Sequence, residues 1–263
     1  MAGEAKEKII FFGNGPLADA ALAVLEKKFE IVFHAREKAD LLKVKELKAN
    51  NPGIHGVLAS FGVIIREDVL ELFEPEGILN IHPSLLPAYR GASPIESAIL
   101  AGDTEFSVSI MKLVRAMDAG PIYYQRTFKD LPLNKAEIYR VLASDGAEWI
   151  AENLTNLPEP MAQDDEKATF TTKFSKSDAL IDPSTETAEE IFRKIVAFQG
   201  FPKVKFAFYG IPCIILEAKV LKVGETAPLV LECARGSKIA ILRLQPENRK
   251  PMDVKSFLNG YVK

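Results

Sequence analysis

Hydrophobic and polar positions follow two different periods along the first part of the chain. Short apolar runs bounded by Gly or Pro are typical of strands that are buried on both faces of a parallel sheet. These runs lie at residues 8–12, 30–35, 53–61, 77–82, 106–114 and 121–125. Apolar residues at helical spacing predict helices over residues 16–29, 38–50 and 66–73, from residue 94 onward, and from 134 to about 156. We therefore predict a doubly wound, mostly parallel α/β sheet.

The pattern changes in the second half of the chain. Residues 158–168 contain two prolines, four acidic residues and few large apolar side chains, which is typical of an interdomain linker. After it, short alternating strands are separated by Gly and Pro turns, and they predict a small, open OB-like β-barrel. We therefore expect a first domain over residues 1–157, the linker over 158–168 and a second domain over 169–263.

Composition fits a protein of two globular domains. The 263 residues are 48% hydrophobic and 26% charged, which is ordinary for a soluble protein. No apolar run approaches the roughly 20 residues of a membrane span, and the charged N-terminal stretch carries no secretory signal, so we expect a cytoplasmic protein. Cys213 and Cys233 lie far apart without a nearby His, which favours buried thiols over a metal site or a disulfide.

One strand end carries candidate chemistry. Asn80 and His82 stand two residues apart, so their side chains point to the same side of the predicted strand. The strand ends there in a Pro-rich loop, and ligands of open α/β sheets bind outside the carboxyl ends of the strands. Asp118 follows the run over residues 106–114. At this second strand exit it could orient the imidazole or accept a proton from it.

The alternative for each histidine is a structural role. His34 and His55 lie in strand-like runs without polar partners in register, and we interpret both as structural. For His82 the spacing and the placement favour function. An amide, an imidazole and a carboxylate without a Ser or Cys nucleophile suggest direct attack by an amine or by water. Three such groups do not make a cage for a hard cation, so we expect no metal.

The stretch GILNIHPSLLPAYRGASPIESAILAGDTEFSVSIMKLVRAMDAGPIYYQ resembles the N10-formyltetrahydrofolate-dependent formyltransferases. In that family an Asn-x-His and a downstream Asp form the catalytic trio, which the resemblance places at Asn80, His82 and Asp118. The Ser-Leu-Leu-Pro run after the His is the family's folate signature. The resemblance therefore implies 10-formyltetrahydrofolate as co-substrate. We expect it to be held by Phe61, Gly62, Val63, Ile64, Ser84, Leu85, Leu86 and Pro87.

Further stretches resemble the branch of the family that acts on methionyl-tRNA. The run YRGASPI at residues 89–95 is similar to the R-G-A-x-P-I of that branch, and residues 169–202 and 244–260 resemble its C-terminal domain. The resemblance implies transfer of the formyl group to the α-amino group of initiator methionyl-tRNA, for translation initiation, with the second domain holding tRNA. Basic residues that would contact tRNA phosphates are Arg36, Lys38, Arg90, Lys173, Lys176, Arg249 and Lys250.

One departure keeps a second substrate class open. The tRNA branch carries a long basic loop between its second and third strands, whereas residues 34–53 are short and offer few basic side chains. The alternative is an N-formyltransferase for a nucleotide-linked amino sugar, which would use the same catalytic trio. An RNA-binding or folate-sensing protein with a decayed site is disfavoured because all three catalytic residue types are present. We expect a monomer without an obligate protein partner and without a membrane.

Overall fold

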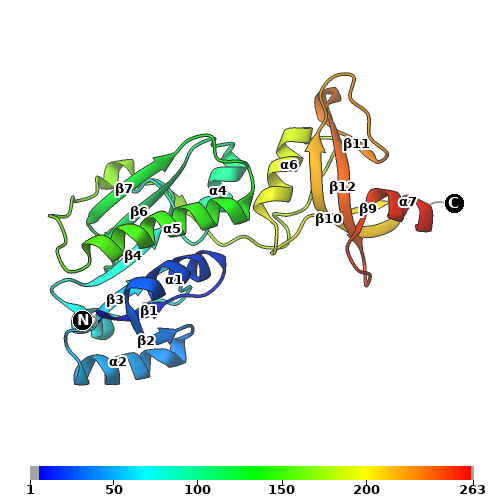
Figure 1. Ribbon diagram of the computed structural model, residues 1–263. Coiled ribbons are helices and arrows are strands. Elements are labelled where there is room, and N and C mark those ends of the chain that lie inside the picture. The colour runs from blue at the N-terminus through cyan, green and yellow to red at the C-terminus, as the bar shows by residue number, and fades with distance from the viewer. Residues whose placement is uncertain (1–5, 262–263) are drawn as a thin grey trace. The chain divides into compact units, whose positions relative to one another are not determined.

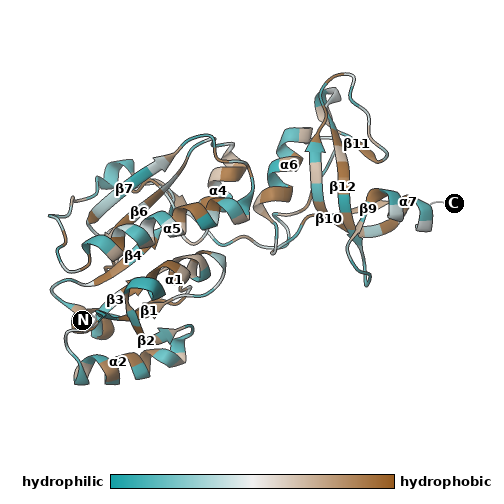
Figure 2. Ribbon diagram, in the orientation of Figure 1, coloured by the Kyte–Doolittle hydropathy of each residue, from teal (hydrophilic) through white to brown (hydrophobic). Residues whose placement is uncertain are grey.

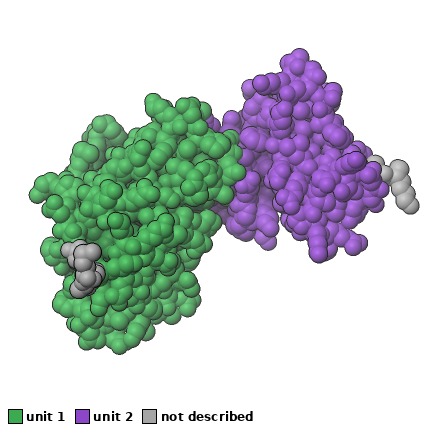
Figure 3. Space-filling view, viewed as in Figure 1, with its two compact units in different colours: residues 1–95, 104–172 green, residues 96–103, 173–263 purple. Residues whose placement is uncertain are grey.

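A computed structural model describes residues 6–261, and the chain divides into two compact units (Figure 3). The first unit is made of the residues up to 95 and of residues 104–172. The second unit is made of residues 96–103 and 173–263. The first two residues of helix α4 (Pro94–Ala101) belong to the first unit, and the rest of the helix belongs to the second unit.

The first unit is built on a six-stranded sheet (Figure 1). Its strands are β1 (Lys8–Phe12), β2 (Glu30–Ala35), β3 (His55–Leu58), β4 (Ile78–His82), β6 (Phe106–Lys112) and β7 (Ile122–Phe128). They are arranged in the order β2-β1-β3-β4-β6-β7. Neighbours among β1 to β4 are parallel, while β6 runs antiparallel to both β4 and β7. The prediction of a mostly parallel α/β sheet is confirmed.

Helices cover both faces of this sheet. On one face α1 (Pro16–Lys28) lies beside α5 (Lys135–Asn153), and the absence of a side chain at Gly146 lets α5 approach Ile81 and Ile110 (Figure 1). The other face packs Ile10 and Phe12 against Phe73 in a buried cluster. This cluster draws on α2 (Leu41–Asn50), α3 (Glu67–Leu70) and the 3-10 turn η2 (Glu71–Phe73), and the turn η1 (Lys38–Asp40) precedes α2. Hydrophobic residues gather on the strands, while the helices turn hydrophilic residues outward (Figure 2).

A polar and aromatic contact fixes α5 to the edge strand β7. The rings of Tyr124 and Trp149 are stacked, with centroids 5.3 Å apart and planes 15° from parallel. The Tyr124 hydroxyl donates to Asp145 Oδ2 at 3.0 Å, and Arg126 contacts the other oxygen of that carboxylate at 2.7 Å. Burial, followed by the hydrogen bond to Asp145, raises the pKa of the Tyr124 hydroxyl.

The segment that we expected to be a linker, residues 158–168, lies within the first unit. Met161 exchanges two backbone hydrogen bonds with Ile122, at 2.7 and 2.8 Å. The segment then forms the turn η3 (Asp165–Lys167) and leads to β8 (Phe170–Thr171), which pairs in parallel with β5 (Arg90–Gly91). Its polar side chains therefore form hydrogen bonds with loops of the first unit. Composition alone does not distinguish such side chains from those that face water.

The second unit is a small antiparallel β domain, as its alternating strands predicted. Its strands are β9 (Lys205–Phe208), β10 (Ile211–Val220), β11 (Val230–Glu232), β12 (Lys238–Pro246) and β13 (Met252–Asp253). Their order is β11-β12-β10-β9, with β13 paired to β12. The helices are α6 (Ala188–Ala197), which a capping box of Thr187 and Glu190 begins, α7 (Val254–Tyr261) and the short turn η4 (Ala234–Gly236). Among the described residues β9 and β11 are the two edges of the sheet and do not pair with each other. The domain is thus an antiparallel half-barrel, which agrees with the predicted open, OB-like barrel.

Candidate active site

The fold places Asn80 and His82 on one face of β4. Ile81 packs against Gly146 of α5, so its two neighbours along the strand point to the opposite face. Ile78, which shares their face, belongs to the core cluster with Phe73. Asn80 and His82 continue that face toward the carboxyl end of β4, and each is only 4% exposed. The strand thus provides a buried amide and a buried imidazole side by side.

Asp118 reaches this face from the loop between β6 and β7, which follows the predicted strand. Because β6 is antiparallel to β4, its carboxyl end pairs Lys112 with Leu79, near the start of β4 and away from His82. We expected Asp118 at the exit of this strand without assigning the strand a direction, and β6 is antiparallel to β4. Residues 113–121 form a loop that carries Asp118 over Asn80 and His82. Asp118 has φ = 48°, a left-handed conformation that is uncommon for a non-glycine residue.

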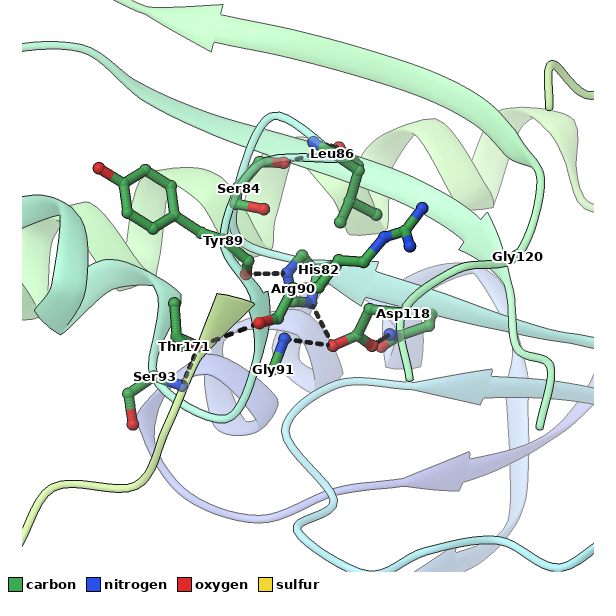
Figure 4. Close-up of polar contacts among 12 residues, drawn as sticks. His82, Ser84, Leu86, Tyr89, Arg90, Gly91, Ser93, Asp118, Gly120 and Thr171 are labelled. Atoms are coloured by element: carbon green, nitrogen blue, oxygen red, sulfur yellow. Dashed lines mark hydrogen bonds and ion pairs between the residues drawn. The ribbon is translucent and has the colours of Figure 1, made fainter. Parts of the chain in front are cut away.

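The side chains of Asn80 and His82 both approach the Asp118 carboxylate, and Figure 4 shows His82 and Asp118. Its Oδ1 lies 3.5 Å from Asn80 Nδ2, and its Oδ2 lies 3.7 Å from His82 Nδ1. The backbone N–H of Gly91 donates to Oδ2 at 2.8 Å, which is the shortest of these three contacts. His82 Nε2 contacts the Tyr89 carbonyl at 3.1 Å. Because a carbonyl only accepts, this contact assigns a proton to Nε2 and turns Nδ1 toward the carboxylate.

The loop after His82 is fixed by a buried hydroxyl. Ser109 of β6 is fully buried, and its Oγ donates to the Ser84 carbonyl at 2.6 Å. The same oxygen accepts the Leu86 N–H at 3.2 Å and the Gln125 amide at 2.9 Å, and that amide also donates to the Leu86 carbonyl at 2.9 Å. Ser84 Oγ in turn donates to the Ala88 carbonyl at 2.7 Å. Sequence reasoning missed Ser109 and Gln125, whose roles depend on the β4–β6 and β6–β7 registers.

The predicted folate residues divide into two groups in the structure. Phe61 is 3% exposed and packs edge-to-face on Phe12, and Leu86 is also 3% exposed, so both side chains belong to the protein core. Ile64 is 83% exposed and Leu85 is 47% exposed, which leaves two apolar side chains open to a ligand. The other predicted members are the partly buried Val63, the buried Ser84, Pro87 at the end of the loop and Gly62, whose φ is +68°.

One predicted tRNA contact does not have the required exposure. The Arg90 side chain is 4% exposed, and its guanidinium bonds Gln163 Oε1 at 3.0 and 2.7 Å and Asp165 Oδ1 at 2.7 Å. The prediction that Arg90 binds a phosphate is therefore corrected: this arginine is committed to internal partners. The remaining predicted basic residues are all exposed, and they are Arg36, Lys38, Lys173, Lys176, Arg249 and Lys250.

Several residues around the trio were not among the site residues predicted from the sequence. Gly91 supplies the hydrogen bond to Asp118, and Tyr89 supplies the carbonyl that faces His82. Thr171 Oγ1 donates to the Arg90 carbonyl at 3.3 Å and accepts the Ser93 N–H at 3.2 Å (Figure 4). Gly91 leaves no room for a side chain, because a Cβ there would lie 2.4 Å from the Thr171 carbonyl. The R-G pair in the run YRGASPI was the available clue to this packing.

Two features are absent from the part of the chain that the structure describes, residues 6–261. No three side chains of the types His, Cys, Asp and Glu are grouped as metal ligands. No helix there has both the length and the apolar character that a bilayer crossing requires.

Comparison with protein families shows to which family the chain belongs. Residues 14–154 match the formyl transferase family, and residues 173–262 match the C-terminal domain of formyl transferases. The chain belongs to the formyltransferase family. The family match spans the whole trio, from β4 to the loop of Asp118, and the match to the C-terminal domain begins one residue after the first unit ends.

Two relatives of this formyltransferase extend over most of its length. A methionyl-tRNA formyltransferase of Roseiflexus sp. (strain RS-1) is 35% identical over 236 residues, which cover 84% of this chain and 72% of the relative. A methionyl-tRNA formyltransferase of Neisseria meningitidis serogroup C is 35% identical over 260 residues, which cover 93% of this chain and 82% of the relative.

Solved structures support the fold of the formyltransferase. HypX from Aquifex aeolicus in complex with tetrahydrofolic acid matches 98% of this chain with a TM-score of 0.73 at 17% identity. This chain spans about half of that protein, 47% of its length. An N-formyltransferase from Helicobacter canadensis, solved with folinic acid and dTDP-3-aminofucose, matches 90% of this chain and 98% of its own, with a TM-score of 0.62 at 18% identity.

Proposed function

We propose that this formyltransferase moves the formyl group of 10-formyltetrahydrofolate to the α-amino group of methionyl-tRNA, the reaction that prepares initiator tRNA for translation. The observation that carries the proposal is the joint match of both halves of the chain. A relative that bears the name methionyl-tRNA formyltransferase shares 35% identity across 93% of the chain. The buried trio of Asn80, His82 and Asp118 provides the groups that the chemistry needs.

Asn80 and His82 are suited to stabilise the oxyanion. When the amine attacks the formyl carbon, the carbonyl oxygen takes up a negative charge in the tetrahedral intermediate. The Asn80 amide carries two N–H donors that only the long contact to Asp118 engages among the described residues. A protonated His82 adds a further donor at Nδ1, because its Nε2 already faces the Tyr89 carbonyl. Both side chains are buried, which strengthens their electrostatic effect on a charge that develops beside them.

Asp118 is suited to manage the proton. The attacking amine loses one proton as the new C–N bond forms, and N10 of tetrahydrofolate gains one as the old C–N bond breaks. Asp118 Oδ2 is held by the Gly91 N–H and faces His82 Nδ1 at 3.7 Å. The carboxylate can thus orient the imidazole and pass the proton toward the leaving nitrogen. These steps use the side chains alone, with no metal ion.

The folate is expected beside the exposed apolar residues of the two loops at this edge. Ile64 and Leu85 present open apolar side chains, and Gly62 offers backbone without a side chain. A flat pterin ring fits between apolar walls that carry backbone donors and acceptors. The residues Val63, Ser84 and Pro87 shape these loops, while Phe61 and Leu86 support them from the core.

The tRNA is expected to contact cations of both units. Arg36 and Lys38 belong to the first unit, and Lys173, Lys176, Arg249 and Lys250 belong to the second. All six are exposed and make no ion pair among the described residues. We further propose a cytoplasmic monomer, since the substrates are soluble and the site draws all its groups from one chain.

A second candidate is an N-formyltransferase for a nucleotide-linked amino sugar. The observation that favours it is the short connection between β2 and β3, where only Arg36, Lys38, Lys43, Lys45 and Lys48 are basic. Of these, Lys43 and Lys45 pair with Glu46 and Asp68, and Lys48 is buried. The N-formyltransferase from Helicobacter canadensis also matches 90% of this chain.

A comparison of the two acceptors in parallel reactions tests the proposal. The purified protein would be incubated with 10-formyltetrahydrofolate and either methionyl-tRNA or a dTDP-linked amino sugar, and the formylated product measured. We expect formyl-methionyl-tRNA to form at the higher kcat/KM. Affinity for the tRNA should fall steeply with salt, and replacing each true phosphate contact by Ala should reduce that slope by about 0.7 to 0.9. Preferential formylation of the sugar, with a shallow salt slope, would overturn the proposal.

A further inference from the structure

Gln163 has every hydrogen-bonding position of its side chain occupied. Its Nε2 donates to the Asp118 carbonyl at 2.8 Å and to the Gly120 carbonyl at 2.7 Å. Its Oε1 accepts from Arg90 Nε at 3.0 Å and from the terminal guanidinium nitrogen at 2.7 Å. The orientation of the amide follows from these partners, because a flipped amide would set donors against a guanidinium and an oxygen against two carbonyls.

These four bonds connect the backbone on both sides of the Asp118 carboxylate. On one side, Gln163 holds the carbonyls of the loop that carries Asp118. On the other, Arg90 lies in β5 directly before Gly91, whose N–H donates to Asp118 Oδ2 at 2.8 Å. Arg90 itself is 4% exposed, so its guanidinium is anchored rather than solvated. The side chain of Gln163 therefore spans the loop and the strand that together determine where the carboxylate lies.

The other partners of the carboxylate are too distant to fix it. Asn80 Nδ2 at 3.5 Å and His82 Nδ1 at 3.7 Å are at or beyond the limit of a hydrogen bond. Asp118 also holds a left-handed backbone conformation, φ = 48°, which persists only where the surroundings impose it. Something other than the catalytic side chains must hold the loop, and the Gln163 amide bonds to its backbone at two points.

We propose that Gln163, bound to Arg90, is a positioning residue for Asp118: it holds the 118–120 backbone against β5 so that the carboxylate stays within reach of Asn80 and His82. Gln163 acts through Asp118 and does not touch the reacting atoms. The inference rests on the proposed function only in assigning Asp118 to the chemistry. In this proposal the segment 158–168 contributes to the site through Gln163.

Gln163→Glu tests the proposal with little change in size. Glu keeps an oxygen for Arg90 but sets a second oxygen against the carbonyls of Asp118 and Gly120, which it cannot bond. We expect kcat to fall about 10- to 100-fold with the KM for 10-formyltetrahydrofolate nearly unchanged, because a displacement of about 1 Å costs up to about 100-fold in rate. Gln199→Glu, the same change at an exposed position of the second unit, should leave kcat unchanged.

A double-mutant cycle separates positioning from general support of the fold. In an Asp118→Asn background, Gln163→Glu should lower kcat less than about threefold, because the group that it positions is already lost. An equal loss in both backgrounds, or a Gln163→Glu variant with wild-type kcat, would overturn the proposal. Any acceptor that the wild-type protein formylates serves for this cycle.

Hydrogen exchange at the Gly91 amide tests the same inference without catalysis. In the wild-type protein this N–H is bonded to Asp118 Oδ2, so it should be protected, and Asp118→Ala should remove the protection. We expect Gln163→Glu to reduce the protection at Gly91 and Gln199→Glu to leave it unchanged. Full protection in Gln163→Glu contradicts the inference whatever the substrate is, whereas a protein without formyl transfer contradicts only the proposed function.

Discussion

Ionisable side chains are buried at both ends of the six-stranded sheet, but their hydrogen bonds differ between the two ends. At the carboxyl end of β4, Asp118 approaches Asn80 and His82 at 3.5 and 3.7 Å. At the amino end of β3, Lys48 donates to the Pro52 carbonyl at 2.5 Å and to the Ile54 carbonyl at 2.7 Å. The Lys48 ammonium also lies 4.9 Å from the centre of the Phe73 ring.

The difference shows that burial of a charged group does not identify a functional site. Burial lowers the pKa of Lys48, yet its donors are directed at fixed backbone acceptors, so no ligand is needed to satisfy them. The amide of Asn80 keeps donor capacity that its neighbours use only weakly. Unused hydrogen-bonding capacity on a buried face is therefore the property that leads us to propose the carboxyl end as the place for a substrate.

The largest effect should follow from changing the trio. Asn80→Ala removes an oxyanion donor and should reduce kcat about 100- to 1000-fold, and His82→Ala and Asp118→Ala should be at least as harmful. Circular dichroism and urea unfolding should show an intact fold for Asn80→Ala, since the hydrogen bond of its side chain among the described residues, to Asp118 at 3.5 Å, is weak. Turnover close to wild type in any of the three variants would remove that residue from the mechanism.

An intermediate effect, on stability instead of rate, is expected at the other end of the sheet. Lys48→Met leaves the carbonyls of Pro52 and Ile54 without their donor, which should lower the free energy of unfolding by about 1 to 3 kcal/mol. Urea unfolding measures this loss, and kcat per folded molecule should not change. If kcat fell while the free energy of unfolding stayed the same, the interpretation of Lys48 as a purely structural residue would be wrong.

The smallest effect should come from His55, the first residue of β3. Burial lowers the pKa of its imidazole below the ordinary 6.5, so the unfolded chain takes up a proton more readily than the folded one. Stability should then decline as the pH falls below about 6.5 and be unaffected above it. His55→Gln should flatten that decline in urea unfolding between pH 8 and 5.5. An unchanged decline would assign the acid sensitivity to other groups.

The sequence predicted those parts of the molecule that depend on local pattern. The alternation of apolar runs and helices identified the sheet, and the spacing of Asn80 and His82 placed both on one face of β4. The direction of the strand before Asp118 stayed open because strand direction is a tertiary property: nothing within residues 106–114 distinguishes a parallel from an antiparallel neighbour. Arg90 was misread for a similar reason, since its partner Gln163 lies 73 residues away.

The segment 158–168 illustrates the limit of composition. Its prolines and acidic residues are those of a linker, but Gln163 and the residues that follow bond to the loops around the trio. A fragment that ended near residue 160 would lose these contacts, whereas one that ended at residue 172 would keep them. Polar residues that satisfy buried backbone groups and polar residues that face water have the same composition, and only the fold separates them.

The stacked pair of Tyr124 and Trp149 gives the molecule a built-in optical reporter. Trp149 is the only tryptophan in the chain, and it lies in α5 of the first unit. Its emission, excited selectively, therefore reports on the environment of one unit and carries no direct signal from the other. Unfolding followed by tryptophan fluorescence and by circular dichroism in parallel would show whether the unit with the trio and the β unit lose their structure together or in sequence.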